Sequence, residues 1–286
     1  MLVTLSEILH KAEQGNYAVV APDFTSMASI RFQLEAAEQF KAPLILSYFN
    51  HFEPLCPLRS WEKWINIIRG ECAQYDIDIC LHLDHGVTVE ECRQAVDAGF
   101  TGVMMDASLK PFSENVELTS RVVEFAHAAG VSVEAEIGHV GTAADSTYHT
   151  KDSALAHLTH PDQAEKFARQ TGMDCLAVAI GTVHGEYIGE PRIDFSLLDE
   201  INRLVSVPLV LHGGSDTGDE NIKRAVALGI RKINVFSDWI VPSQRETARL
   251  ITDDPKDVAR VAIAQQAVIH DVLAHWFQIS GSVNKG

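Results

Sequence analysis

Three stretches of the chain each carry an apolar run into a His-Gly pair. They are 79–86 (ICLHLDHG), 175–185 (CLAVAIGTVHG) and 208–215 (PLVLHGGS). Such runs are typical of buried strands, and a turn at a strand end holds a side chain in a fixed position. Three imidazoles with an open fourth position are the ligands of a catalytic zinc ion. The pattern predicts that one metal ion is held by His85, His184 and His212. The alternative is three unrelated core histidines.

Carboxylates also lie at the ends of predicted strands. Asp84 immediately precedes His85, Asp106 ends an apolar run, and Glu136 shares one face of a strand with Glu134. A carboxylate beside a metal can move a proton or orient an imidazole ligand. Asp84 therefore places a carboxylate beside the predicted metal site. Three roles stay open for Asp106 and Glu136: acceptors for the histidines, ligands of a second cation, or structural carboxylates.

A second group of residues predicts a phosphate site. Gly213-Gly214-Ser215 follows one predicted strand, and 234–237 (NVFS) ends another. Backbone amides at such turns bind anions. A metal, a carboxylate and a phosphate site together suit cleavage of a carbon–carbon bond in a ketose phosphate, where the metal stabilises an enediolate. A Schiff-base route would need a desolvated lysine at a strand end. Lys232 is expected at the opposite end of its strand.

Eight apolar runs alternate with helical patterns and must position these side chains. We predict an α/β fold, a parallel (β/α)8 TIM barrel of one domain over 1–286 with extra terminal helices at 237–251 and 256–279. The alternative is an open doubly wound sheet, but no GxGxxG motif follows the first strand. The predicted strands are 17–21, 43–48, 79–84, 101–106, 131–137, 175–180, 208–211 and 232–235.

Composition narrows the classes of function. The chain has 286 residues, 46% of them hydrophobic, and a formal net charge of −16. That charge disfavours nucleic acid and anionic membranes as partners, and no apolar run approaches the ~18 residues of a membrane span. The cysteines number five, an odd count that is typical of reduced thiols. We expect a cytoplasmic protein that uses local backbone amides to bind an anionic substrate.

The motifs LHLDHG, VMMDAS, VEAEIG, AVAIGTVHG, LVLHGGS and GIRKINV together resemble the class II, zinc-dependent fructose-bisphosphate and tagatose-bisphosphate aldolase family. The resemblance covers nearly the whole chain. It implies a homodimer or homotetramer that reversibly cleaves a ketose bisphosphate to dihydroxyacetone phosphate and an aldehyde. It also implies one zinc ion per chain and a monovalent cation nearby.

Residue by residue, the resemblance makes the three histidines the zinc ligands and gives Asp84 the proton of the C4 hydroxyl. It places a further set around dihydroxyacetone phosphate. That set is Gly185, Gly213, Gly214, Ser215, Asn234 and Ser237, with Val235 and Phe236 in the same segment.

The chain departs from the family pattern in its substrate residues. Asp23 stands where the family usually has asparagine, and it would repel a phosphate unless it binds a hydroxyl or a cation. Lys256 stands where an arginine reaches a neighbouring subunit's distal phosphate, and lysine lacks the bidentate fork. Both changes predict weak use of fructose 1,6-bisphosphate.

A long segment, 139–160, has no clear periodicity and is expected to be a mobile active-site loop. Ala144 replaces the family's glutamate that moves the proton on the enediolate carbon. The nearest carboxylate is Asp145, which we predict to be catalytic, with His149 as the second candidate. The missing glutamate keeps open a non-catalytic relative that binds sugar phosphate. A metal-dependent hydrolase or isomerase on the same barrel is the other alternative.

Overall fold

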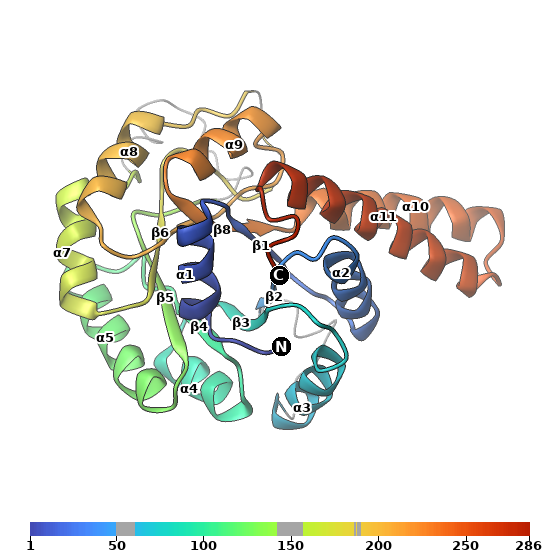
Figure 1. Ribbon diagram of the computed structural model, residues 1–286, viewed down its shortest axis with the longest axis horizontal. Helices are drawn as coiled ribbons and strands as arrows, with labels where there is room; N and C mark the ends of the chain where they lie inside the picture. Colours follow the sequence, from blue (N-terminus) through green and yellow to red (C-terminus); the bar gives the residue numbers. More distant parts are fainter. Residues whose placement is uncertain (50–60, 142–156, 186, 188–189) are drawn as a thin grey trace.

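The computed structural model describes residues 1–49, 61–141, 157–185, 187 and 190–286. Parallel strands form a closed barrel in the order β1 to β8, and helices surround it (Figure 1). The predicted (β/α)8 barrel is confirmed. The open sheet is wrong, because β1 pairs with β8 and no edge remains. The strands are β1 Val19–Pro22, β2 Leu44–Phe49, β3 Ile79–Gly86, β4 Gly102–Met105, β5 Ser132–Ile137, β6 Cys175–Val178, β7 Leu209–Leu211 and β8 Ile230–Val235.

Capping residues set where a helix begins and ends, as in the helix after β3. Thr88 accepts a hydrogen bond from the Glu91 amide at the start of α4, and Gly99 in the left-handed conformation ends it. The helices are α1 Leu5–Gly15, α2 Met27–Gln39, α3 Trp61–Cys72, α4 Val89–Ala98, α5 Phe112–Ala128, α7 Pro161–Thr171, α8 Phe195–Leu204, α9 Asp219–Ala227, α10 Ser237–Asp253 and α11 Val258–Ile279.

The interior of the barrel has an apolar end and a polar end. Helix α1 lies across the barrel in Figure 1 and buries Leu5, Ile8 and Leu9 against inward residues such as Val19 and Val210. This cluster closes the amino-terminal end of the barrel. Beyond it, the interior is polar and includes the fully buried His82, Glu134 and Lys232. The functional site is therefore expected at the carboxyl ends of the strands.

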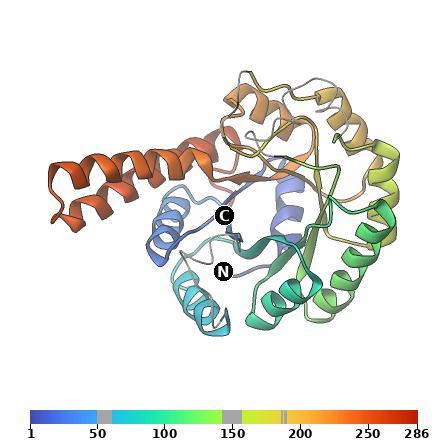
Figure 2. The same cartoon turned by 180° about the vertical axis from the view of Figure 1, so that it is seen from behind.

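Helices α10 and α11 pack side by side and extend away from the barrel as a long helical pair, seen from both sides in Figures 1 and 2. Residues 254–257 join the two helices at the outer end of the pair. Ile251, Val258 and Ile263 on the pair are exposed. Within the described residues, no helix is long and apolar enough to cross a membrane. The described cysteines, Cys72, Cys80, Cys92 and Cys175, are buried and unpaired.

Candidate active site

Asp84 and His85 are neighbours in sequence, yet both contribute to the same site. Successive side chains on a regular strand point to opposite faces. Here the register between β3 and β4 shifts between Leu83 and Gly86, and His85 has a φ of 49°. This conformation is uncommon outside glycine. The irregularity brings the His85 Nε2 to 3.9 Å from the Asp84 Oδ2.

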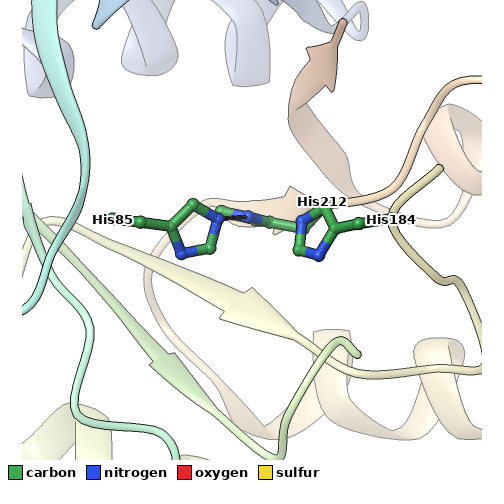
Figure 3. Close-up of side chains that lie close together, drawn as sticks. All are labelled: His85, His184 and His212. Atoms are coloured by element: carbon green, nitrogen blue, oxygen red, sulfur yellow. Dashed lines mark hydrogen bonds between the residues drawn. The ribbon is translucent and has the colours of Figure 1, made fainter. Parts of the chain in front are cut away.

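The three predicted metal ligands converge at the carboxyl end of the barrel. His85 is the last but one residue of β3, His212 directly follows β7, and His184 follows β6 (Figure 3). One ligand nitrogen from each lies within 4.8 Å of the others. The His85 Nε2 and the His212 Nδ1 are only 2.9 Å apart. Two imidazole nitrogens at this distance can share one proton or bind one cation.

Two carboxylates determine which nitrogen of each imidazole is free. The Asp106 Oδ2 lies 2.8 Å from the His85 Nδ1, and the Glu134 Oε1 lies 2.9 Å from the His212 Nε2. A carboxylate accepts the ring N–H, so the opposite nitrogen keeps its lone pair. In both rings the opposite nitrogen is the one that faces the shared point. The donor set therefore fits a metal ion.

The charges around the imidazoles differ. Burial, together with the nearby His85 and His212, lowers the pKa of His184 to about 3, so this ring is neutral. Burial also disfavours a charged His85, but Asp84, Asp106 and Glu136 together raise its pKa to about 10. Without a metal ion the His85 Nε2 therefore holds a proton, and a metal ion that binds there would displace that proton and use the lone pair.

Asp106 and Glu136 lie close to the His85 ring, with Asp106 at its Nδ1. Asp106 also accepts hydrogen bonds from the Ser108 amide and hydroxyl, at 3.1 and 2.7 Å. The Glu136 Oε1 accepts from the Val140 amide at 3.0 Å, and its Oε2 has no partner among the described residues. Asp106 thus orients His85. Ligand atoms of His85, Asp106 and Glu136 are close enough for a second cation, so that role stays open.

Asp84 is positioned by a hydrogen bond to one of its two carboxyl oxygens. Its Oδ1 accepts a hydrogen bond from the Asn234 Nδ2 at 2.9 Å. Burial favours the protonated form, but His85 and the Lys232 ammonium keep the pKa of Asp84 below its ordinary value. The side chain is an ionised carboxylate beside the metal ligands. Asn234, predicted to contact substrate, directly positions Asp84.

The sequence prediction for Lys232 is wrong in position. Strand β8 begins at Ile230, so Lys232 lies inside it, and its fully buried Nζ is 2.8 Å from Glu134 and 3.9 Å from Asp84. Burial alone would lower its pKa, but Glu134 and Asp84 raise it. The amine stays protonated and cannot act as a Schiff-base nucleophile. The missed signal was Glu134, a charge on the same face as Glu136 in an apolar strand.

The predicted phosphate residues form a turn after β7 and, beside it, the junction between the end of β8 and the start of α10. The Ser215 hydroxyl accepts from the amides of Phe236 and Asp238, at 3.2 and 3.3 Å, and so joins the turn to the start of α10. Gly213 has a φ of 66°, and a Cβ there would lie 2.4 Å from the Val183 oxygen. A Cβ on Gly214 would lie 2.7 Å from the Asn234 oxygen. Only glycine lets these segments pack together.

Tyr187 supports the same region, and sequence reasoning missed it. Its hydroxyl accepts from the Val183 amide at 3.1 Å and donates to the Gly213 oxygen at 3.3 Å. These bonds tie the segment that carries His184 and Gly185 to the β7 turn. Gly185 has a φ of 96°. No motif marks Tyr187, because its partners are backbone atoms distant in sequence.

The remaining predicted residues have different locations. Asp23 follows β1 at the barrel mouth, where burial and the charge of Asp84 raise its pKa well above the ordinary value. Lys256 lies at the outer end of the helical pair, away from this site. Asp145, His149 and Ala144 lie outside the described residues.

Comparison with known proteins identifies the family. The model of the class II fructose-bisphosphate aldolases matches residues 3–285. The chain belongs to this family. It is 40% identical over 256 residues to a fructose-bisphosphate aldolase of Geobacillus stearothermophilus, covering 89% of this chain and 87% of the relative. It is 35% identical to one of Helicobacter pylori over the full length of both chains.

Comparison with a solved structure supports the same family. The YdjI aldolase from Escherichia coli K12 superposes with a TM-score of 0.86 at 30% identity, over 99% of this chain and 98% of that one. The aldolase prediction is therefore confirmed at the level of the family. This class II aldolase makes and breaks carbon–carbon bonds, and the family favours that activity over the hydrolase, isomerase and non-catalytic alternatives.

Proposed function

We propose that this aldolase is a zinc-dependent, cytoplasmic enzyme that reversibly cleaves a ketose phosphate to dihydroxyacetone phosphate and an aldehyde. The observation that carries the proposal is the convergence of His85, His184 and His212, with two of the rings oriented by Asp106 and Glu134. Zinc held by these rings would act as a Lewis acid on the substrate ketone and stabilise the negative charge that develops on cleavage.

Side chains and backbone amides of the chain would move the proton of the substrate and bind its phosphate. The second carboxyl oxygen of Asp84 would take the proton of the C4 hydroxyl, so that the C3–C4 bond breaks and the aldehyde leaves. The turn at Gly213–Ser215 and the junction at 234–237 would bind the phosphate of dihydroxyacetone phosphate through their remaining backbone amides. Support comes from the Asn234 bond to Asp84 and from the close packing of the turn and the junction.

The metal prediction is tested by chelation and by His184→Ala. Verified removal of zinc, or loss of this ligand, should lower turnover at least about a hundredfold, and zinc should restore the chelated wild type. The free energy of unfolding should barely change, because the barrel core packs without the metal. Full activity after verified metal loss would contradict the proposal that the enzyme depends on zinc.

Cleavage leaves a carbanion on dihydroxyacetone phosphate, which needs a proton. Asp145 is the proposed donor, because it is the carboxylate nearest in sequence to the family's missing glutamate. Asp145→Asn should slow hydrogen exchange between dihydroxyacetone phosphate and solvent at least about a hundredfold, with phosphate affinity little changed. Exchange at the wild-type rate would exclude Asp145 as the proton donor. The donor would then be His149 or an ordered water.

The proposed assembly is a homodimer or homotetramer. It is supported by the exposed apolar side chains on the α10–α11 pair, which a second copy of the chain could cover.

A further inference from the structure

Several buried polar atoms near Asp84 have no hydrogen-bond partner among the described residues. Besides the two ring nitrogens of His82, they include the Asp23 Oδ1, the Ser47 Oγ and the Asn234 Oδ1. Asp23 is 6% exposed, Ser47 0% and Asn234 8%. A buried polar group without a hydrogen-bond partner destabilises the folded protein. Three such atoms in one region therefore indicate a site that a bound molecule completes.

Strand register places the three side chains on one face. Strands β8, β1, β2 and β3 are consecutive neighbours in the barrel. Residues that pair across parallel strands share a face, and so do residues two apart on one strand. Asn234, Asp23, Ser47 and Asp84 therefore all face the barrel interior, and we call the first three the polar arc. The pairs are Ala21–Asn234, Asp23–Ser47 and Phe49–Asp84.

The chemistry of the polar arc favours a partner that donates hydrogen bonds. The Asn234 amide nitrogen already donates to Asp84, so the atom left free is an acceptor oxygen. Asp23 offers a carboxyl oxygen, and Ser47 a hydroxyl that donates or accepts. Sugar hydroxyls match all three groups. A phosphate at neutral pH offers mainly acceptors.

Asp84 acts in the same direction. Its carboxyl group lies next to the polar arc and accepts a hydrogen bond from the Asn234 amide at its Oδ1. Its second oxygen is a further acceptor, to which a sugar hydroxyl can donate and a fully ionised phosphate cannot. The nearby Lys232 ammonium is already paired with Glu134 at 2.8 Å.

We propose that the polar arc recognises hydroxyl groups on the carbon chain of a ketose that carries a single phosphate, and that it disfavours a second phosphate. This inference rests on the proposed function. The one phosphate binds at the β7 turn and the β8–α10 junction, and the hydroxyls of the sugar chain complete the unpaired atoms of Asp23, Ser47 and Asn234.

The test compares substrates that differ only in the second phosphate. We would measure kcat/KM for fructose 1-phosphate against fructose 1,6-bisphosphate, and for the matching tagatose pair, in the zinc-loaded enzyme. The wild type should prefer at least one monophosphate over its bisphosphate by about tenfold or more, which corresponds to about 1.4 kcal/mol. Asp23→Asn should reduce this preference at least about tenfold, because it replaces a carboxyl oxygen with an amide group that can donate a hydrogen bond to a phosphate.

Ser47→Ala provides the second variant, and Ser243→Ala its matched control. Ser243 is also a buried serine whose hydroxyl has no partner among the described residues, but it lies on α10. Ser47→Ala should lower kcat/KM for the monophosphate more than for the bisphosphate, whereas Ser243→Ala should leave their ratio unchanged. A merely structural role for Ser47 would lower both values equally and overturn its assignment.

A binding measurement gives a readout without turnover. Hexitol 1-phosphate and hexitol 1,6-bisphosphate lack the ketone, so they bind without reacting. Calorimetry should show the monophosphate binding the wild type more tightly, and Asp23→Asn should shift the balance toward the bisphosphate. A bisphosphate preference in the wild type, or ratios unchanged by both variants, would overturn the inference while the aldolase proposal stands. Failure to cleave any of these sugars or to exchange dihydroxyacetone phosphate would instead refute the proposed function.

Discussion

Glu134 shows how a single side chain connects the metal site to the barrel core. It is fully buried, and it accepts hydrogen bonds from His212 at 2.9 Å and from Lys232 at 3.0 Å. Lys232 lowers the pKa of Glu134 well below its ordinary value, although burial opposes this. The carboxylate therefore stays ionised and fixes the orientation of His212. A buried carboxylate of this kind depends on its counter-charge.

Lys232→Met should destabilise the fold strongly. Removing one partner of a buried ion pair leaves the other charge uncompensated, which costs about 3–5 kcal/mol. The free energy of unfolding in denaturant would measure the loss. Lys223→Met is the control, because Lys223 pairs with the exposed Glu220 on the surface of α9, and this change should be nearly neutral. Equal effects of the two substitutions would contradict a structural role for the buried pair.

At the scale of elements, the turn after β7 and the β8–α10 junction act as one unit. The Ser215 hydroxyl accepts amides at the start of α10, and the Tyr187 hydroxyl bonds both Val183 and Gly213. The segment after β6 is thereby tied to the same unit. This unit and the His184 segment can hold their positions only if backbone approaches backbone closely at Gly213.

Gly213→Ala should weaken both stability and phosphate binding. The new Cβ would add steric overlap with Val183 to the cost of a positive φ, and overpacking of this kind costs about 1–3 kcal/mol. Gly130→Ala is a matched control, because Gly130 has a φ of 73° but nothing within 4 Å of the added atom. Unfolding and titration with dihydroxyacetone phosphate would compare the two. If Gly130→Ala were as damaging, backbone strain alone would explain the result.

At the scale of the whole molecule, the helical pair α10–α11 separates Lys256 from the site of its own chain. Residues 254–257 join the two helices at the end farthest from the barrel (Figure 2). Lys256 can therefore contribute to a substrate site only in another copy of the chain. The lysine also provides a single point charge, where a guanidinium would bind phosphate in a bidentate manner.

Lys256→Arg tests this distal role. We expect the KM for fructose 1,6-bisphosphate to fall by about tenfold, because one added charge-assisted hydrogen bond contributes roughly 1.5–3 kcal/mol. The KM for fructose 1-phosphate should not change, which makes it the internal control. Steady-state kinetics, with the oligomeric state measured by light scattering, would test both points. An unchanged KM for the bisphosphate would remove Lys256 as the explanation for weak use of that substrate.

Local patterns in the sequence were enough to predict the barrel and the histidine cluster. Apolar runs that alternate with helical periodicity specify parallel strands, and parallel strands bring their carboxyl ends to the same face. His85, His184 and His212 each follow such a run, so their convergence needed no knowledge of long-range packing. The family motifs on the same runs led to the aldolase assignment, which the comparisons confirm.

The tertiary structure decided which side chains serve one another. Glu134 orients His212, Lys232 lies inside the barrel, and Asp23, Ser47 and Asn234 form one polar arc. These contacts join residues on different strands, and they depend on the register with which the barrel closes. A one-residue slip would turn each inward side chain outward. Register follows from the packing of all the strands together, so no local pattern in the sequence could specify these partners.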